Sequence, residues 1–103
     1  MKSSSAKALL TTHNLAMDAA TLNHSLVLAG VLAHKMYLST SGSGEEKSFL
    51  VFTDAGSEFG KNAASGFHEF KTDTKFFDER FGDAYLLAVD ALLKQAHDLF
   101  DSQ

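Results

Sequence analysis

Residues 83–100 have the sequence DAYLLAVDALLKQAHDLF, the most strongly patterned stretch of the chain. Apolar side chains recur there every three or four residues in two neighbouring rows. The first row consists of Leu86, Val89, Leu93, Ala96 and Phe100, and the second of Tyr85, Ala88, Leu92 and Leu99. A broad apolar face beside one polar row is typical of a helix packed on a core. We therefore predict a helix over 83–100, with Asp83 capping its first turn and Leu86, Val89 and Leu93 facing inward.

A second apolar stripe runs through the first third of the chain. Its members are Leu15, Ala19, Leu22, Leu26, Ala29, Ala33 and Met36, spaced alternately by four and three residues. This spacing predicts a helix, but one reaching residue 38 would be roughly 50 Å long, too long for a small domain unless it pairs with another chain. Gly30 weakens a helix, so we predict one helix from Ser5 to about Gly30, preceded by a flexible end at residues 1–5. Whether residues 24–39 are helix or strand is left open by the pattern.

The middle of the chain contains a turn flanked by strand-like segments. Residues 41–46, SGSGEE, are the clearest turn signal, and residues 47–53, KSFLVFT, are rich in residues that favour strands. We predict a hairpin with strands at 32–39 and 47–53. Because a lone hairpin is marginal in water, it must lie on the helices or pair with a second subunit.

Six of the nine phenylalanines fall between Phe59 and Phe81. Phe59, Phe67 and Phe70 have helical spacing, which predicts a short helix, with Thr72 starting a further turn. We expect these rings to fill the core between the hairpin and the last helix; the alternative is an exposed aromatic patch. The predicted fold is a single α+β domain over residues 1–103, predominantly helical, with an N-terminal helix, a central β-hairpin, short helices and a long amphipathic C-terminal helix.

Composition excludes several classes of function. The chain has no cysteine, which excludes disulfides, thiolate zinc sites and a cysteine nucleophile. Its net charge is −4 with Arg80 as the single arginine, which argues against direct binding of nucleic acid. The apolar run at 26–33 is too short to span a membrane, and we expect a cytoplasmic protein.

Chemistry could reside in scattered acids and histidines. His13 and His24 share a face of the predicted helix but would be roughly 16 Å apart, so they cannot share an ion; we expect neither a metal nor a cofactor. An enzyme would need general acids and bases around an aromatic-lined pocket. The candidate catalytic residues are Asp54, His68, Asp90 and His97.

The favoured interpretation is a small, non-enzymatic protein-binding or adaptor module that self-associates, with a further protein partner as an option. The predicted interface residues are Leu15, Leu22, Leu26, Phe67 and Phe70. The alternatives are a small ligand- or metal-dependent enzyme and an acidic mimic that blocks a nucleic-acid-binding protein. The mimic would need one exposed acidic face made of Asp78, Glu79, Asp83, Asp90 and Asp101.

Overall fold

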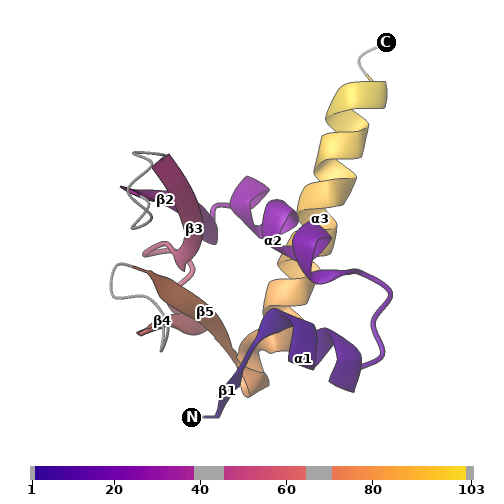
Figure 1. Cartoon of the computed structure of the whole chain (residues 1–103). Helices are drawn as coiled ribbons and strands as arrows, with labels where there is room; N and C mark the ends of the chain where they lie inside the picture. The colour runs from indigo at the N-terminus through magenta and orange to yellow at the C-terminus, as the bar shows by residue number, and fades with distance from the viewer. Residues whose placement is uncertain (1, 39–45, 65–70, 102–103) are drawn as a thin grey trace.

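The computed structural model describes residues 2–38, 46–64 and 71–101, and within them the chain has an α+β fold. Three α-helices, one 3-10 helix and five strands in two small sheets make up this part of the chain (Figure 1). The sheets lie on one side of the molecule and the long C-terminal helix rises on the other, with the second of the two short helices between them and the first beside the foot of the long helix (Figure 1). The predicted fold class is therefore confirmed.

The first sheet is the predicted hairpin. Strands β2 (Leu32–Leu38) and β3 (Glu46–Phe52) pair antiparallel, with Leu32 opposite Phe52. Both strands agree with the prediction to within about one residue, while the predicted turn falls mainly on residues outside the described ranges. At the base of the hairpin the Thr53 hydroxyl donates to the Gly30 carbonyl oxygen (2.6 Å). Gly30 has a φ of 82°, a conformation that glycine adopts without strain.

The second sheet corrects the sequence prediction. Strand β5 (Thr72–Phe77) lies between β4 (Gly60–Ala64) and β1 (Ser3–Ser4), and both neighbours are antiparallel to it. The helix predicted around Phe59 and the turn predicted at Thr72 are therefore wrong, because long-range strand pairing overrides the local helical spacing. Ser3 and Ser4 of β1 pair with Phe77 and Phe76 of β5, contacts that the predicted flexible end at residues 1–5 did not include.

The N-terminal stripe does not form one helix. Helix α1 (Ala6–Thr12) is capped by the Ser5 hydroxyl, which accepts from the Ala8 N–H (3.2 Å). The chain then turns at Asn14, whose φ is 52°, and α2 (Ala19–Leu28) begins after Asp18. Asparagine tolerates this left-handed conformation better than most residues, and a new cap restarts the helix. The stripe of leucines persists across the break because the loop and α2 both face the core.

The core is centred on Phe76, which is fully buried. The ring of Phe76 makes edge-to-face contacts with Phe52 (5.0 Å between centroids) and Phe81 (5.4 Å), so these phenylalanines fill the core as expected. After the 3-10 helix η1 (Asp78–Arg80), helix α3 (Phe81–Phe100) begins two residues earlier than predicted. Asp83 is consequently not the cap, and it forms an ion pair with Arg80 (3.0 Å) within the first turn.

A side chain joins the two sheets. The Phe52 N–H, at the end of β3, donates to Oδ1 of Asn62 in β4 (2.8 Å). The Asn62 Nδ2 in turn donates to the Phe52 carbonyl oxygen (3.5 Å). The amide of Asn62 therefore satisfies both backbone groups of Phe52, as a paired strand residue would.

Candidate functional site

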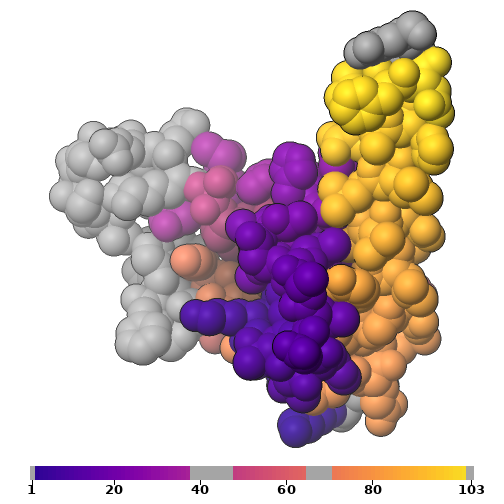
Figure 2. Space-filling model, turned by 90° about the vertical axis from the view of Figure 1, so that its right-hand side faces the viewer, coloured from indigo at the N-terminus to yellow at the C-terminus, as the bar shows by residue number. Residues whose placement is uncertain are grey.

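Helix α3 presents a row of exposed apolar side chains. We call this row the outer seam; it consists of Leu86, Val89, Leu93 and Phe100. Their exposed fractions are 62%, 39%, 56% and 65%. At 3.6 residues per turn, the four lie within about 60° of one another around the helix axis. Figure 2 shows the last turns of α3 standing clear of the rest of the molecule.

The outer seam contradicts the predicted orientation of the helix. The side chains of α3 that are buried are Phe81, Ala84 and Ala88, whereas Leu86, Val89 and Leu93 face outward. Both rows of the helix are apolar, so periodicity alone could not decide which row meets the body. The small Ala84 and Ala88 allow a close approach of the helix to its neighbours, and the larger leucines are left on the other side.

The outer seam continues into a groove at the start of α3, which we call the α3 groove. It has a volume of about 570 Å³. Its lining residues are His13, Leu15, Asp78, Phe81, Gly82, Asp83, Tyr85 and Leu86. The ring of His13 stacks over that of Phe81, with centroids 6.1 Å apart. A Cβ atom added at Gly82 would meet nothing within 4 Å, so the groove is open directly above this residue.

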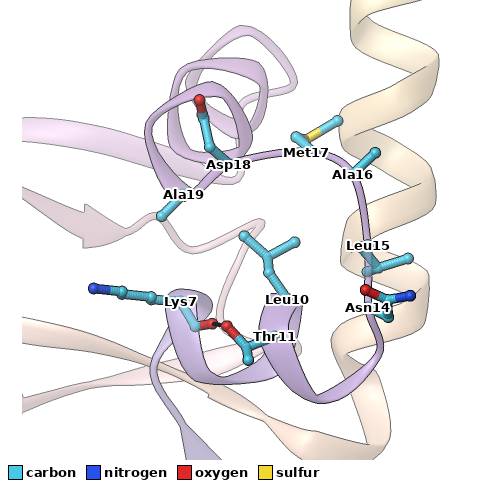
Figure 3. Close-up of a pocket in the computed structure, with 9 residues that line it drawn as sticks. All are labelled: Lys7, Leu10, Thr11, Asn14, Leu15, Ala16, Met17, Asp18 and Ala19. Atoms are coloured by element: carbon cyan, nitrogen blue, oxygen red, sulfur yellow. Dashed lines mark hydrogen bonds between the residues drawn. The ribbon is translucent and has the colours of Figure 1, made fainter.

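A second cavity, of about 500 Å³, lies where α1 turns into α2 (Figure 3). Leu10, Leu15 and Met17 supply apolar surface, and Lys7, Thr11, Asn14 and Asp18 supply polar surface. The Thr11 hydroxyl donates to the Lys7 carbonyl oxygen (2.9 Å), so it is engaged within α1 (Figure 3). Leu15 borders both this cavity and the α3 groove.

Asp18 at the rim of this cavity has a structural role. Its Oδ1 accepts from the Thr21 N–H (2.7 Å), which caps α2. Hydrogen bonds from the backbone and then the side chain of Thr21 favour the ionised form and lower the pKa of Asp18 below its ordinary value. Because the pKa is depressed in the folded state, the stabilisation is present at neutral pH and is lost as the pH falls through the depressed pKa.

We expect Asp18→Ala to lower the melting temperature at pH 7, with the difference from wild type shrinking below about pH 4. Asp18→Asn should keep much of the cap without its titration, since Asn is also a good capping residue. Thermal unfolding followed by circular dichroism between pH 7 and about pH 2.5 measures both effects. A wild-type-to-Ala difference that is the same at both ends of this range would contradict the capping role.

The candidate catalytic residues are not brought into one cleft by either cavity. Asp54 is exposed in the turn after β3, and Asp90 and His97 are exposed on α3. Nδ1 of His97 lies 2.7 Å from Oδ2 of Asp101, one turn further along the helix. None of these residues lines the α3 groove or the second cavity, and His68 lies outside the described residues.

The structure also bears on the alternatives of a metal-dependent enzyme and of an acidic mimic. Within the described residues, no group of three or more histidine and acidic side chains is arranged to hold a metal ion. Of the acids required for a mimic, Asp78 accepts from the Ser4 hydroxyl, Asp83 pairs with Arg80 and Asp101 pairs with His97. These carboxylates are therefore already engaged within the chain.

The predicted interface residues fall in different places. Leu22 and Leu26 are fully buried in the core, so they are not on the surface of the folded chain. Leu15 is half-buried at the α3 groove, and Phe67 and Phe70 lie outside the described ranges. Sequence reasoning did not assign Phe100 or Gly82 to an interface, although the three–four spacing of the C-terminal helix contained the signal for the outer seam.

No protein-family model, curated protein or solved structure matched the chain. Among the described helices, none is long and apolar enough to cross a membrane.

Proposed function

We propose that the protein is a small, non-enzymatic protein-binding module that self-associates through the outer seam of α3. The observation that carries this proposal is the exposure of Leu86, Val89, Leu93 and Phe100 in one row. Monomeric proteins rarely leave a contiguous row of large apolar side chains in water, and such rows mark interaction sites. Spacings of three, four and seven residues are those of helices that pair side by side.

The size of the surface is adequate for pairing. With roughly 150–250 Å² for a fully exposed large side chain, the seam residues present on the order of 400 Å² per chain. Two copies can then bury up to about 800 Å² from these side chains alone, which approaches the roughly 1,000 Å² expected of a specific interface, and the adjoining α3 groove offers further surface.

The charged side chains of α3 are grouped together and leave the outer seam apolar. Asp83, Asp90, Lys94 and Asp98 lie along one edge of the seam, between it and the buried side of the helix, and are all exposed. Charged side chains remain solvated there at no cost. The helix therefore has one side on the body of the protein, one side for a partner and one side for water.

Leu93→Glu should disrupt self-association because it places a carboxylate at the centre of the seam. Since a symmetric pair contains the substitution twice, we expect the dissociation constant to rise by more than about 100-fold. The matched control is Gln95→Glu, which adds the same charge to the same helix on a different side. Sedimentation velocity of the three proteins between about 1 and 200 µM, with circular dichroism to verify folding, makes the comparison.

The expected result is a concentration-dependent dimer for wild type and Gln95→Glu, and a folded monomer for Leu93→Glu. A wild-type mass of one chain across the whole range would contradict self-association. Equal weakening by both substitutions would show that the seam is not the contact surface.

A further inference from the structure

From the proposed self-association we infer, further, that two copies of α3 pair antiparallel, with Phe100 of each copy inserted over Gly82 in the α3 groove of the other. The inference rests on the proposed function and specifies its partner, orientation and register. It starts from the heptad positions along the seam. Leu86, Leu93 and Phe100 occupy one core position of the heptad, and Gly82, Val89 and Ala96 occupy the other.

In an antiparallel pair, residues at one core position of the first helix lie opposite residues at the other core position of the second helix. If Val89 lies opposite Leu93 of the second copy, then Leu86 lies opposite Ala96 and Gly82 lies opposite Phe100. In each of these layers a larger side chain meets a smaller one, so the interface fills evenly. A parallel pair in register would instead set Phe100 against Phe100 and Gly82 against Gly82, which overfills one layer and empties another.

The space above Gly82 fits the aromatic ring. A Cβ at Gly82 would meet nothing within 4 Å, and the α3 groove there measures about 570 Å³. Phe100 is the most exposed of the large apolar side chains that the structure describes, at 65%. Leu15 and Tyr85 line the groove with apolar surface. Phe100 (the knob) and the space above Gly82 (the hole) lie on the same helix, about 27 Å apart at 1.5 Å per residue. Because a helix cannot fold back on itself, a second copy is needed to bring the two together.

In the alternative antiparallel register the two helices are shifted by one heptad, so they overlap over seven fewer residues. It would set Leu93 against Ala96 and Val89 against Phe100, and the described residues of the second copy would then leave Leu86 and the α3 groove uncovered. The longer overlap buries the whole seam, which favours it.

Charges along the open edge of the seam agree with the longer overlap. Asp83, Asp90 and His97 follow one another at heptad spacing beside the seam. In the longer overlap His97 of one copy lies beside Asp83 of the other, twice by symmetry, which is favourable when the imidazole is charged. Asp83 already faces Arg80 (3.0 Å) and His97 already faces Asp101 (2.7 Å). The two Asp90 side chains meet near the symmetry axis. Among the described residues of this charged edge, theirs is the one contact between like charges.

Disulfide trapping tests the orientation and the register, because the natural chain has no cysteine. Chains carrying Leu86→Cys are mixed with isotope-labelled chains carrying Ala96→Cys in a glutathione redox buffer, and the covalent dimers are identified by mass. We expect the mixed 86–96 dimer to exceed both same-residue dimers by at least about 10-fold, since only residues with close Cα atoms are bridged. The control mixture, Leu87→Cys with Gln95→Cys, lies off the seam and should give no preferred product.

Each other outcome overturns the inference in a distinguishable way. A dominant 96–96 dimer would indicate a parallel pair, and faster bridging of Leu93→Cys with Ala96→Cys would indicate the shorter register; both leave the proposed function intact. If none of the cysteine variants gave a covalent dimer although the wild-type protein sediments as a dimer, the contact would lie elsewhere. A monomeric wild type would remove the proposed function together with the inference.

A complementation experiment tests the knob and the hole. Gly82→Trp fills the groove, and Phe100→Ala removes the knob, so each variant alone should associate at least about 10-fold more weakly than wild type. In a mixture, Phe100 of the first variant meets the free Gly82 of the second, and the indole introduced into the first variant meets the space that alanine leaves in the second. We expect the mixture to form heterodimers with near wild-type affinity. Failure of the mixture to recover, with both variants folded by circular dichroism, would overturn the insertion of Phe100.

Discussion

Replacement of Gly60 by alanine is expected to destabilise the fold by more than about 3 kcal/mol, a large share of the roughly 5–15 kcal/mol that stabilises a typical domain. Gly60 begins β4 and lies opposite Phe76 in β5. A Cβ atom there would lie 2.5 Å from Cζ of Phe52 and closer still to the Lys75 carbonyl oxygen. Neither neighbour can give way, because one is main chain and the other is a buried ring against Phe76.

Gly82→Ala is the matched control, since the same added methyl group meets nothing within 4 Å. It should be neutral or stabilise by up to about 1 kcal/mol, because alanine is the better helix former. Both variants are best made in the Leu93→Glu background, so that self-association does not contribute to the measured stability. Urea unfolding followed by circular dichroism gives the comparison, and equal stabilities for the two would refute the close packing at β4.

Phe76→Ala is expected to cost about 3–5 kcal/mol, the range found for truncation of buried aromatic residues. Phe76 is fully buried and joins the two sheets to α3 through its contacts with Phe52 and Phe81. Its removal leaves a cavity at a point where the two sheets and α3 meet.

Phe77→Ala provides the control for Phe76→Ala, because it removes the same group from the adjacent, half-buried position of β5. We expect its cost to be less than half as large, as measured by the same urea titration in the same background. A larger loss for Phe77→Ala than for Phe76→Ala would contradict the placement of the core.

Local sequence signals were sufficient to predict those helices and strands whose conformation is favoured by their own residues. The C-terminal helix has good helix formers throughout and no interior proline, and its observed bounds differ from the prediction only at the start. The hairpin was identified from its turn residues and from the β-rich segment at residues 47–53. In both cases propensity and pattern agree with the tertiary structure.

Local signals failed where distant pairing decides the conformation. The sequence of β4, GKNAA, contains no residue that favours strands, and its pairing with β5 and the hydrogen bonds of Asn62 to Phe52 hold it extended. For β5 a signal was present: Thr72, Thr74 and Phe76 alternate with Asp73 and Lys75, which is the two-residue period of a strand. The break between α1 and α2 depends on one left-handed residue, Asn14, and no proline or glycine marks it.

The candidate site was only partly predictable for a related reason. An amphipathic pattern shows that a face is apolar, but not what covers it. Leu22 and Leu26 belong to a three–four stripe like that of Leu86 and Leu93, yet the first pair is buried within the chain and the second pair is exposed. Only the folded chain shows which stripe has been left without an internal partner.

The link between Asn62 and Phe52 also bears on how the protein stays in solution. A free strand end with an unsatisfied N–H and C=O is a template on which foreign chains add as further strands, the first step towards fibrils. By occupying both groups of Phe52, Asn62 blocks that growth where β3 ends. Loss of this amide would therefore leave a strand end with two unsatisfied groups, which would cost stability and favour ordered aggregation in concentrated solutions.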